Sequence, residues 1–408
     1  MRLACANGDP LWLAYGMNVH PGGSAAVLEQ ALDAVVAPLR ARLGWTGPLG
    51  LALRLDAAGA RELLAQPARL EALRQRLAGE ALVPFTVNGF VLGRFHGAGV
   101  KDSVYRPSWR EAGREEATLA IAEVLARLRG PGHVVSLSSA PGTWRGWGEP
   151  AAEAGREAAA RLARTARRLS ELEARTGTRV VVVLEPEPGC SLDTVEDAQS
   201  FFAGPLAAAL GEDAVARRHL GLCYDACHQA VMFEDGPHGL QRLAQAGIPV
   251  AKVQASCALE LPDASDPAGR AALARFVEPT WLHQTTTRDG AGRVHLLPDL
   301  PLALAARGAP WEGRASWRTH FHVPVFRERA VGPLRTTQSS LVPVLARVAA
   351  GGVTSHLEVE TYTWEALPQD ERDAGSGHDL VEALARELAW TRATLEAHGA
   401  RAAGAGGA

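Results

Sequence analysis

Carboxylate and imidazole side chains gather at three places in this sequence, each at the end of an apolar run. The segments are VVVVLEPEPG at 180–189, GLCYDACHQ at 221–229 and SHLEVETYTW at 355–364. Carboxylates and imidazoles bind divalent cations and also transfer protons as general acids and bases. Because the chemistry of parallel barrels collects at the carboxyl ends of their strands, this placement indicates a metal-using enzyme.

The acidic residues in these segments are spaced for a shared face. Side chains alternate faces along a strand, so Glu185 lies on the same face as Glu187, and Glu358 on the same face as Glu360. Such partners are about 6.6 Å apart, whereas oxygen ligands lie about 2.0–2.6 Å from a cation. One member of each pair can therefore bind a cation directly, while the other supports it or lies deeper in the barrel.

A cation would also offset the repulsion between carboxylates at one barrel mouth. Two carboxylates 4 Å apart repel each other by about 4 kcal/mol at an effective dielectric constant near 20. The alternative is that rim arginines such as Arg54 or Arg318 neutralise these carboxylates through salt bridges. The repetition of the pattern at three strand ends favours the cation.

The rest of the chain supplies the elements that would position these residues. Apolar, β-branched runs alternate with helical patterns almost to the end, which is typical of a parallel sheet built from strand–helix units. The predicted strands cover 11–19, 49–55, 82–88, 133–138, 179–186, 219–225, 249–256 and 354–361. Ser24 and Gly177 are expected to cap helices at their N- and C-terminal ends. The expected fold class is therefore α/β, a (β/α)8 barrel.

The chain is longer than a minimal barrel. A typical barrel uses about 250 residues, so roughly 150 of the 408 remain for insertions and tails. Residues 257–337 are expected to form one large insertion between strands 7 and 8 that lies over the barrel mouth. Residues 88–109 are a second candidate rim loop. We expect one domain over 1–398 and a disordered tail over 399–408.

Bulk composition narrows the function classes. The net charge is −3, and the sequence lacks the basic blocks of a nucleic-acid-binding protein. It has neither a secretory signal pattern nor an apolar run long enough to span a membrane, and its five cysteines do not suggest a disulfide framework. We expect a cytoplasmic protein that acts on a small molecule. The sequence leaves its oligomeric state open.

Several of these motifs also resemble a known superfamily. The LEP motif at 184–186, the D-x-x-H motif at 225–228 and the strand-end Glu360 resemble the xylose isomerase-like TIM barrels of the sugar phosphate isomerase and epimerase superfamily. In more detail, the chain resembles the EboE family of metabolite traffic proteins. The motifs that carry this second resemblance are NVHPG at 18–22, FTVNGF at 85–90, VKDSVYRPSW at 100–109, LEPEPG, CYDACH, HFHVPVF at 320–326 and LEVETYTW.

The superfamily resemblance implies roles for individual residues. Glu185, Asp225 and Glu360 would coordinate the cation, and Glu185 and Glu360 would also act as the acid and base pair. Where the superfamily presents a metal-binding histidine on strand seven, this chain has Gln254, a weaker ligand. An imidazole of the insertion, His320 or His322, could take its place. The cation could be Mn, Zn, Co or Fe.

Other polar and aromatic residues near the strand ends are candidates for substrate binding. They are His228, Glu187, Asn18, His20, Asn88, His96, His320, Glu358, Tyr362 and Trp364. For Asn18 and His20, a loop-capping amide and an exposed imidazole are equal alternatives. Lys252 could form a Schiff base or pair with an acidic neighbour in the lower barrel. Cys223 is expected to be a packed thiol rather than a zinc ligand.

Two functions from different classes fit these observations. The first is a metal-dependent isomerase or epimerase that moves a proton on a small hydroxylated metabolite, sugar-like or isoprenoid-linked, within a biosynthetic or metabolite-trafficking gene cluster. The second is a metabolite-binding protein that keeps the pocket without the reaction. A metal-dependent phosphodiester hydrolase is a third possibility, which the missing basic groove disfavours.

Overall fold

A ring of eight parallel strands forms the centre of the molecule. The computed structural model describes residues 1–97, 99–376 and 379–403. The ring strands are β2 (Pro10–Tyr15), β3 (Leu49–Arg54), β4 (Leu82–Asn88), β5 (Val134–Ser139), β6 (Arg179–Leu184), β7 (Leu220–Asp225), β8 (Val250–Ala255) and β14 (His356–Val359). They pair in the order β2-β14-β8-β7-β6-β5-β4-β3, and a parallel bridge between Gly16 and Ala52 joins the two end strands. The expected (β/α)8 TIM barrel is confirmed.

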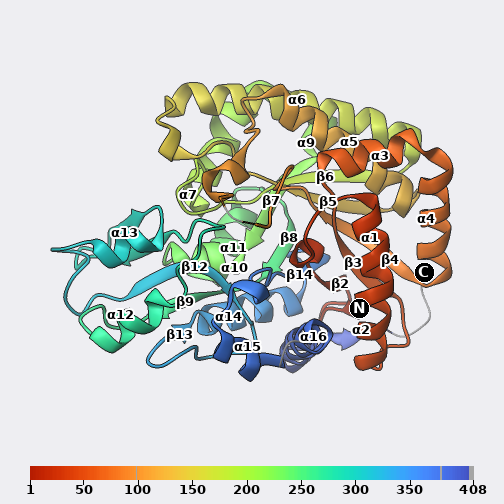
Figure 1. The fold of residues 1–408 in the computed structure, drawn as a ribbon. Helices are drawn as coiled ribbons and strands as arrows, with labels where there is room; N and C mark the ends of the chain where they lie inside the picture. Colours follow the sequence, from red (N-terminus) through yellow and green to blue (C-terminus); the bar gives the residue numbers. More distant parts are fainter. Residues whose placement is uncertain (98, 377–378, 404–408) are drawn as a thin grey trace.

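Helices surround this ring (Figure 1). They are α1 (Ala25–Ala31), α2 (Ala37–Arg42), α3 (Ala57–Ala65), α4 (Pro67–Gly79), α5 (Ala112–Arg129), α6 (Ala151–Thr176), α7 (Val195–Phe201), α8 (Ala207–Leu210), α9 (Ala214–Arg217), α10 (Ala226–Val231), α11 (Gly236–Gln245), α14 (Gln338–Ala350), α15 (Gln369–Ser376) and α16 (Leu380–Ala397). Ser24 accepts a hydrogen bond from the backbone of Val27, and Gly177 ends α6 with φ 71°, so both predicted caps are present. Every residue of β3 and β7 is buried, as expected for strands covered on both faces.

The insertion forms a second, antiparallel sheet beside the barrel mouth. Its strands are β9 (Cys257–Leu261), β10 (Thr285–Arg288), β11 (Val294–Leu297), β12 (Trp317–Val323) and β13 (Arg335–Thr336), with α12 (Pro267–Ala274) and α13 (Leu300–Ala305). The strand order is β11-β10-β12-β9-β13. All five strands fall within the range 257–337, and β9 begins two residues after β8 ends. The sheet therefore projects directly from the rim at strand seven of the barrel.

The insertion and the rim loop after β4 are joined to each other. The Lys101 ammonium donates to the Asp299 carboxylate at 2.8 Å and to the Trp281 carbonyl at 2.7 Å. The Trp281 indole in turn donates to the Phe95 carbonyl at 2.9 Å. From below, the buried Arg114 on α5 donates to four carbonyl oxygens of the rim loop. Loop and insertion together form a roof at the carboxyl ends of the strands.

The chain termini extend the barrel sheet on one side. Strand β1 (Arg2–Ala4) pairs antiparallel with β2, and β15 (Arg401–Ala402) pairs antiparallel with β1. The predicted disordered tail over 399–408 is therefore wrong for Arg401 and Ala402, whose backbone groups complete this edge, and 404–408 lie outside the described residues. Within the described part of the chain, no helix is both long and apolar enough to cross a membrane.

Glu387 on α16 should make the stability of the fold depend on pH. Its carboxylate is fully buried and accepts hydrogen bonds from the Val325 backbone at 3.2 Å and the Thr361 hydroxyl at 2.6 Å. Burial raises the pKa of Glu387 to about 7. Between pH 5 and this value the folded protein holds a proton that the unfolded chain has lost, so the stability falls as the pH rises.

We expect Glu387→Gln, which cannot ionise and keeps an acceptor oxygen, to gain about 2 kcal/mol over the wild type between pH 5 and pH 8. Urea unfolding at the two pH values measures the difference. The exposed Glu171 on α6 provides a matched control, since Glu171→Gln should show no such gain. A constant difference between Glu387→Gln and wild type would contradict the prediction.

Candidate functional site

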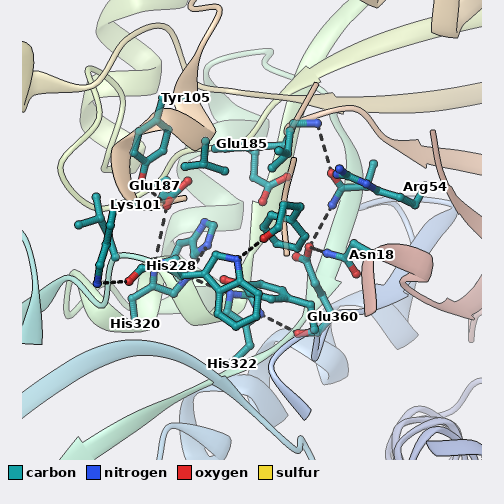
Figure 2. Close-up of a pocket in the computed structure, with 18 residues that line it drawn as sticks. Asn18, Arg54, Lys101, Tyr105, Glu185, Glu187, His228, His320, His322 and Glu360 are labelled. Atoms are coloured by element: carbon teal, nitrogen blue, oxygen red, sulfur yellow. Dashed lines mark hydrogen bonds and ion pairs between the residues drawn. The ribbon is translucent and has the colours of Figure 1, made fainter. Parts of the chain in front are cut away.

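A pocket lies at the carboxyl ends of the strands, under the roof, with an empty volume of about 530 Å³. Nine of the predicted site residues line it: Asn18, Asn88, Glu185, Glu187, His228, His320, His322, Glu360 and Tyr362 (Figure 2). They come from strand ends that lie far apart in the sequence and from β12 of the insertion.

Three carboxylates converge at the base of this pocket. Glu185 follows β6, Asp225 ends β7 and Glu360 follows β14, and one oxygen from each lies within 4.8 Å of the other two. All three side chains are at most 3% exposed. Each also has one buried oxygen without a hydrogen-bond partner in the described structure: Glu185 Oε2, Asp225 Oδ2 and Glu360 Oε2. Buried carboxylates that lie this close together could hold a divalent cation.

The second oxygens of two of these carboxylates are held by neighbouring donors. Asp225 Oδ1 accepts from the His228 backbone, which it caps at the start of α10, and from the Ser256 hydroxyl, both at 2.8 Å. Glu360 Oε1 accepts from the amides of Asn18 at 2.6 Å and Asn88 at 3.0 Å. These bonds fix the orientation of the free oxygens, as supporting hydrogen bonds do around metal ligands.

Burial and like charges shift the pKa values of the carboxylates in this cluster. Burial raises the pKa of Glu185 to about 8. Burial, together with repulsion from Glu185, raises the pKa of Glu360 well above its usual range. Burial opposes ionisation of Asp225 too, but the adjacent imidazoles of His228 and His322 outweigh it and lower the Asp225 pKa. A divalent cation would reverse the shifts of the two glutamates by compensating their charge.

Three imidazoles face one another beside the carboxylates. Their Nδ1 atoms lie 2.7–3.0 Å from oxygens that can only accept: His228 from Pro186 O, His322 from Glu360 O and His320 from Gln284 Oε1. Each Nδ1 therefore carries the proton, which leaves Nε2 as an acceptor when the ring is neutral. The His320 Nε2 is 3.2 Å from that of His228 and 3.0 Å from that of His322. Facing lone pairs require a shared proton or a cation.

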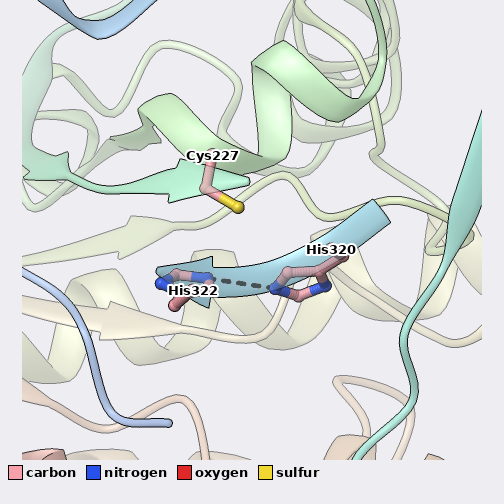
Figure 3. Close-up of side chains that lie close together, drawn as sticks. All are labelled: Cys227, His320 and His322. Carbon is pink, nitrogen blue, oxygen red and sulfur yellow. Dashed lines mark hydrogen bonds between the residues drawn. The ribbon is translucent and has the colours of Figure 1, made fainter. Parts of the chain in front are cut away.

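The thiol of Cys227 lies against two of these imidazoles (Figure 3). Its sulfur and nitrogens of His320 and His322 are within 4.8 Å of one another. Burial raises the pKa of Cys227 well above its usual value, so the group is a neutral thiol at neutral pH. Because the thiolate is the form that binds metal, Cys227 is a poorer ligand than the imidazoles.

Of the two predicted candidates for a fourth donor, His322 lies close to Asp225 and lines the pocket. Nitrogens of His228 and His322 lie within 4.8 Å of each other and of an Asp225 oxygen. Gln254 stands in register with Asp225 on the neighbouring strand, but its Oε1 accepts from the Cys223 thiol at 3.1 Å and it does not line the pocket. The insertion strand β12 thus delivers imidazoles to the place where strand seven of the barrel lacks one.

Other predicted residues lie outside the pocket. Glu358, a substrate-binding candidate, forms an ion pair with Lys252 deep in the barrel, where both side chains are fully buried. Lys252 therefore pairs with an acidic neighbour, which is the second of its two predicted roles. Glu358 lies away from the place where a substrate would bind. Trp364 packs in the main hydrophobic core.

Two histidines that were predicted to bind substrate contact neighbouring groups of the protein instead of lining the pocket. His20 Nε2 lies 3.0 Å from the Tyr15 hydroxyl, and His96 Nε2 lies 2.8 Å from the Asn18 carbonyl. The second contact supports the segment that carries the Asn18 amide. Neither imidazole lines the pocket.

The structure adds residues to the site. Tyr105 donates to Glu187 Oε1 at 2.6 Å, and the Gln284 amide contacts both residues. Trp281 of the insertion joins Phe95 and Tyr362 in an aromatic wall. Little in the sequence indicated that Trp281 would line the pocket, because it lies in a turn-rich stretch without periodicity.

Neither rim arginine neutralises the carboxylate cluster. Arg318 pairs with Glu260 of the insertion at 3.3 Å. Arg54 lines the pocket, yet its one hydrogen bond in the described structure goes to the Gly93 carbonyl. The salt-bridge alternative for the clustered acids is therefore wrong for these two arginines.

Comparisons with known proteins give structural similarity alone. No protein-family model matches the chain, and no curated protein matches it. Among solved structures it is similar to the probable 3-DHS dehydratase AsbF, involved in petrobactin synthesis, from Bacillus anthracis, with 14% identity and a TM-score of 0.46 over 93% of this chain and 97% of that one. It is also similar to the IolI protein with a binding zinc atom (12%, TM-score 0.47, 94% and 98%). A third is the 3-keto-D-glucoside 4-epimerase YcjR of E. coli (17%, TM-score 0.35, 60% and 77%).

Proposed function

We propose that this protein is a metal-dependent isomerase or epimerase-like enzyme that moves a proton between carbons of a small hydroxylated metabolite. The single observation that carries the proposal is the convergence of Glu185, Asp225 and Glu360 with one unpartnered buried oxygen each. Those oxygens and the His322 imidazole would hold the cation. When bound there, a divalent cation polarises a substrate carbonyl and makes the adjacent carbon more acidic.

Glu185 and Glu360 are proposed to transfer the proton. Both line the pocket and come from β6 and β14, so a substrate between them can lose a proton to one carboxylate and gain one from the other. The Asn18 and Asn88 amides hold Glu360 in position. The aromatic wall and the roof exclude water from the reacting carbon.

Deuterium incorporation tests the proton transfer without knowledge of the product. We expect the metal-loaded protein to exchange a carbon-bound hydrogen of at least one compound from a panel of aldoses, ketoses and hydroxy-ketones in D2O, followed by NMR. Glu185→Gln and Glu360→Gln should each lower the exchange rate at least about 1000-fold, because each removes one of the two proton-transferring groups. Glu234→Gln, a partly buried glutamate outside the pocket, is the control. Unchanged exchange in both pocket variants would refute the acid and base assignment.

The resemblance to the EboE family supports a second proposal, a metabolite-binding protein on the same barrel. The specific observation in its favour is the enclosure of the pocket by the roof, which suits retention of a ligand with or without a reaction. Metal content distinguishes the two: an enzyme of the proposed kind should retain close to one transition-metal ion per chain when purified without chelators. A metal-free protein that binds a metabolite without exchanging its hydrogens would favour the binding role.

A further inference from the structure

Arg54 occupies an unusual environment for a cationic side chain. It ends β3, lines the pocket and is 4% exposed. Its Nη2 donates to the Gly93 carbonyl at 3.2 Å, while Nε and Nη1 are buried without a hydrogen-bond partner among the described residues. The Phe95 ring lies against the guanidinium, with its centroid 5.2 Å from Cζ. A guanidinium is always charged and offers five N–H donors, so most of its capacity is unused here.

The other two buried cationic side chains among the described residues have protein partners. Arg114, which is fully buried, donates to four carbonyl oxygens. Lys252 pairs with Glu358, and Lys101, at the opposite end of the pocket from Arg54 in Figure 2, pairs with Asp299. Leaving a buried charge without an acceptor is costly. An acceptor from outside the chain would remove that cost.

We propose that this pocket takes a small hydroxylated carboxylate, such as a hydroxy acid or sugar acid, and that Arg54 binds its carboxylate group. This inference rests on the proposed function, because it names the substrate class of the same site. The hydroxyl or carbonyl end of the molecule would reach the acidic cluster, and its anionic end would pair with the guanidinium. Charge-assisted hydrogen bonds from arginine to a carboxylate are among the strongest that side chains form.

The donors present favour a carboxylate over a phosphate. Arg54 is a single positive charge, and the second cation of the pocket is already neutralised by Asp299 and two carbonyl oxygens. A phosphate group carries up to two negative charges and is usually met by several cations or by the amides of a helix N-terminus. One guanidinium matches the single charge of a carboxylate.

Calorimetric titration of the full-length protein after removal of metal by a chelator tests the inference. The probes are racemic glycerate, the neutral glycerol and inorganic phosphate, all at constant ionic strength. We expect glycerate to bind, glycerol not to bind, and phosphate to bind more weakly than glycerate. Arg54→Met should weaken glycerate binding at least about tenfold. Its own thermal stability without ligand should be no lower than that of the wild type, because an unpaired buried charge is removed.

Lys101→Met is the matched control, since it removes a pocket cation that already has partners, and it should change glycerate affinity by less than about twofold. The titration uses metal-free protein and measures binding, not proton transfer, so failure of the proton-transfer proposal would leave this inference intact. Glycerate that binds equally well to Arg54→Met, or fails to bind the wild type, would overturn it. Phosphate that binds more tightly than glycerate would overturn the choice of a carboxylate.

Discussion

Asp225→Asn is expected to weaken divalent-cation binding at least about 100-fold while the barrel stays folded. Asp225 belongs to two of the donor groups, one with Glu185 and Glu360 and the other with His228 and His322. The asparagine oxygen can still cap α10 and accept from Ser256, so local structure is kept. What is lost is the charge on the oxygen that has no protein partner. A 100-fold loss corresponds to about 2.8 kcal/mol of binding free energy.

Titration of the chelated protein with Mn²⁺ or Zn²⁺ measures this effect, and circular dichroism verifies the fold. Asp193→Asn provides the control, because Asp193 is also a buried carboxylate but pairs with Arg145 outside the pocket. It should bind the cation as tightly as the wild type. Equal affinity for Asp225→Asn and the wild type would mean that the acidic cluster does not bind the ion.

Lys252→Met is expected to cost about 3 kcal/mol or more in the free energy of unfolding at neutral pH. The Lys252 ammonium pairs with Glu358 and donates to the Ser138 hydroxyl at 3.2 Å, and it is fully buried. Methionine fills most of the space but leaves the Glu358 carboxylate in the barrel interior without its counter-charge. Urea unfolding followed by tryptophan fluorescence gives the size of the loss.

The double variant Lys252→Met/Glu358→Gln separates charge from packing. It removes both ions, so it should recover most of the stability lost in Lys252→Met, as buried ion pairs are often replaceable by neutral groups. If the double variant is as unstable as the single one, the lysine contributes through packing and not through the ion pair. Cation affinity should change little in the double variant, because Glu358 belongs to none of the clustered groups of possible metal ligands and the two charges are removed together.

The sequence was sufficient to place all eight barrel strands, because each is an apolar run with period and length typical of a strand between two helices. The observed strands β2 to β8 and β14 overlap the predicted ranges, with ends that differ by a few residues. The rule that barrel chemistry lies at strand ends also led to the acidic segments, and the superfamily resemblance singled out Glu185, Asp225 and Glu360 within them. Glu185 and Asp225 stand at the ends of the neighbouring strands β6 and β7, whereas Glu360 follows β14, which β8 separates from β7.

Polar side chains outside the acidic cluster were harder to place. His20 and His96 look like site residues from their position near strand ends, yet each contacts a neighbouring group behind the pocket. Glu358 shares a face with Glu360, but one residue pair further into the barrel it meets Lys252 from β8. Sequence spacing predicts on which face of a strand a side chain lies, but it does not predict how deep in the barrel the partner of that side chain lies.

The amino-acid sequence by itself determined the ring of strands, the order of the helices and the placement of acidic residues at strand ends, since these follow from local periodicity. Only the tertiary structure decided that β12 brings His320 and His322 to the cluster, that Gln254 turns to Cys223, and that two nitrogens of Arg54 have no partner among the described residues. Those outcomes depend on how an insertion folds back across the barrel mouth. Contacts between segments so far apart in the chain are set by packing in three dimensions, which no local pattern encodes.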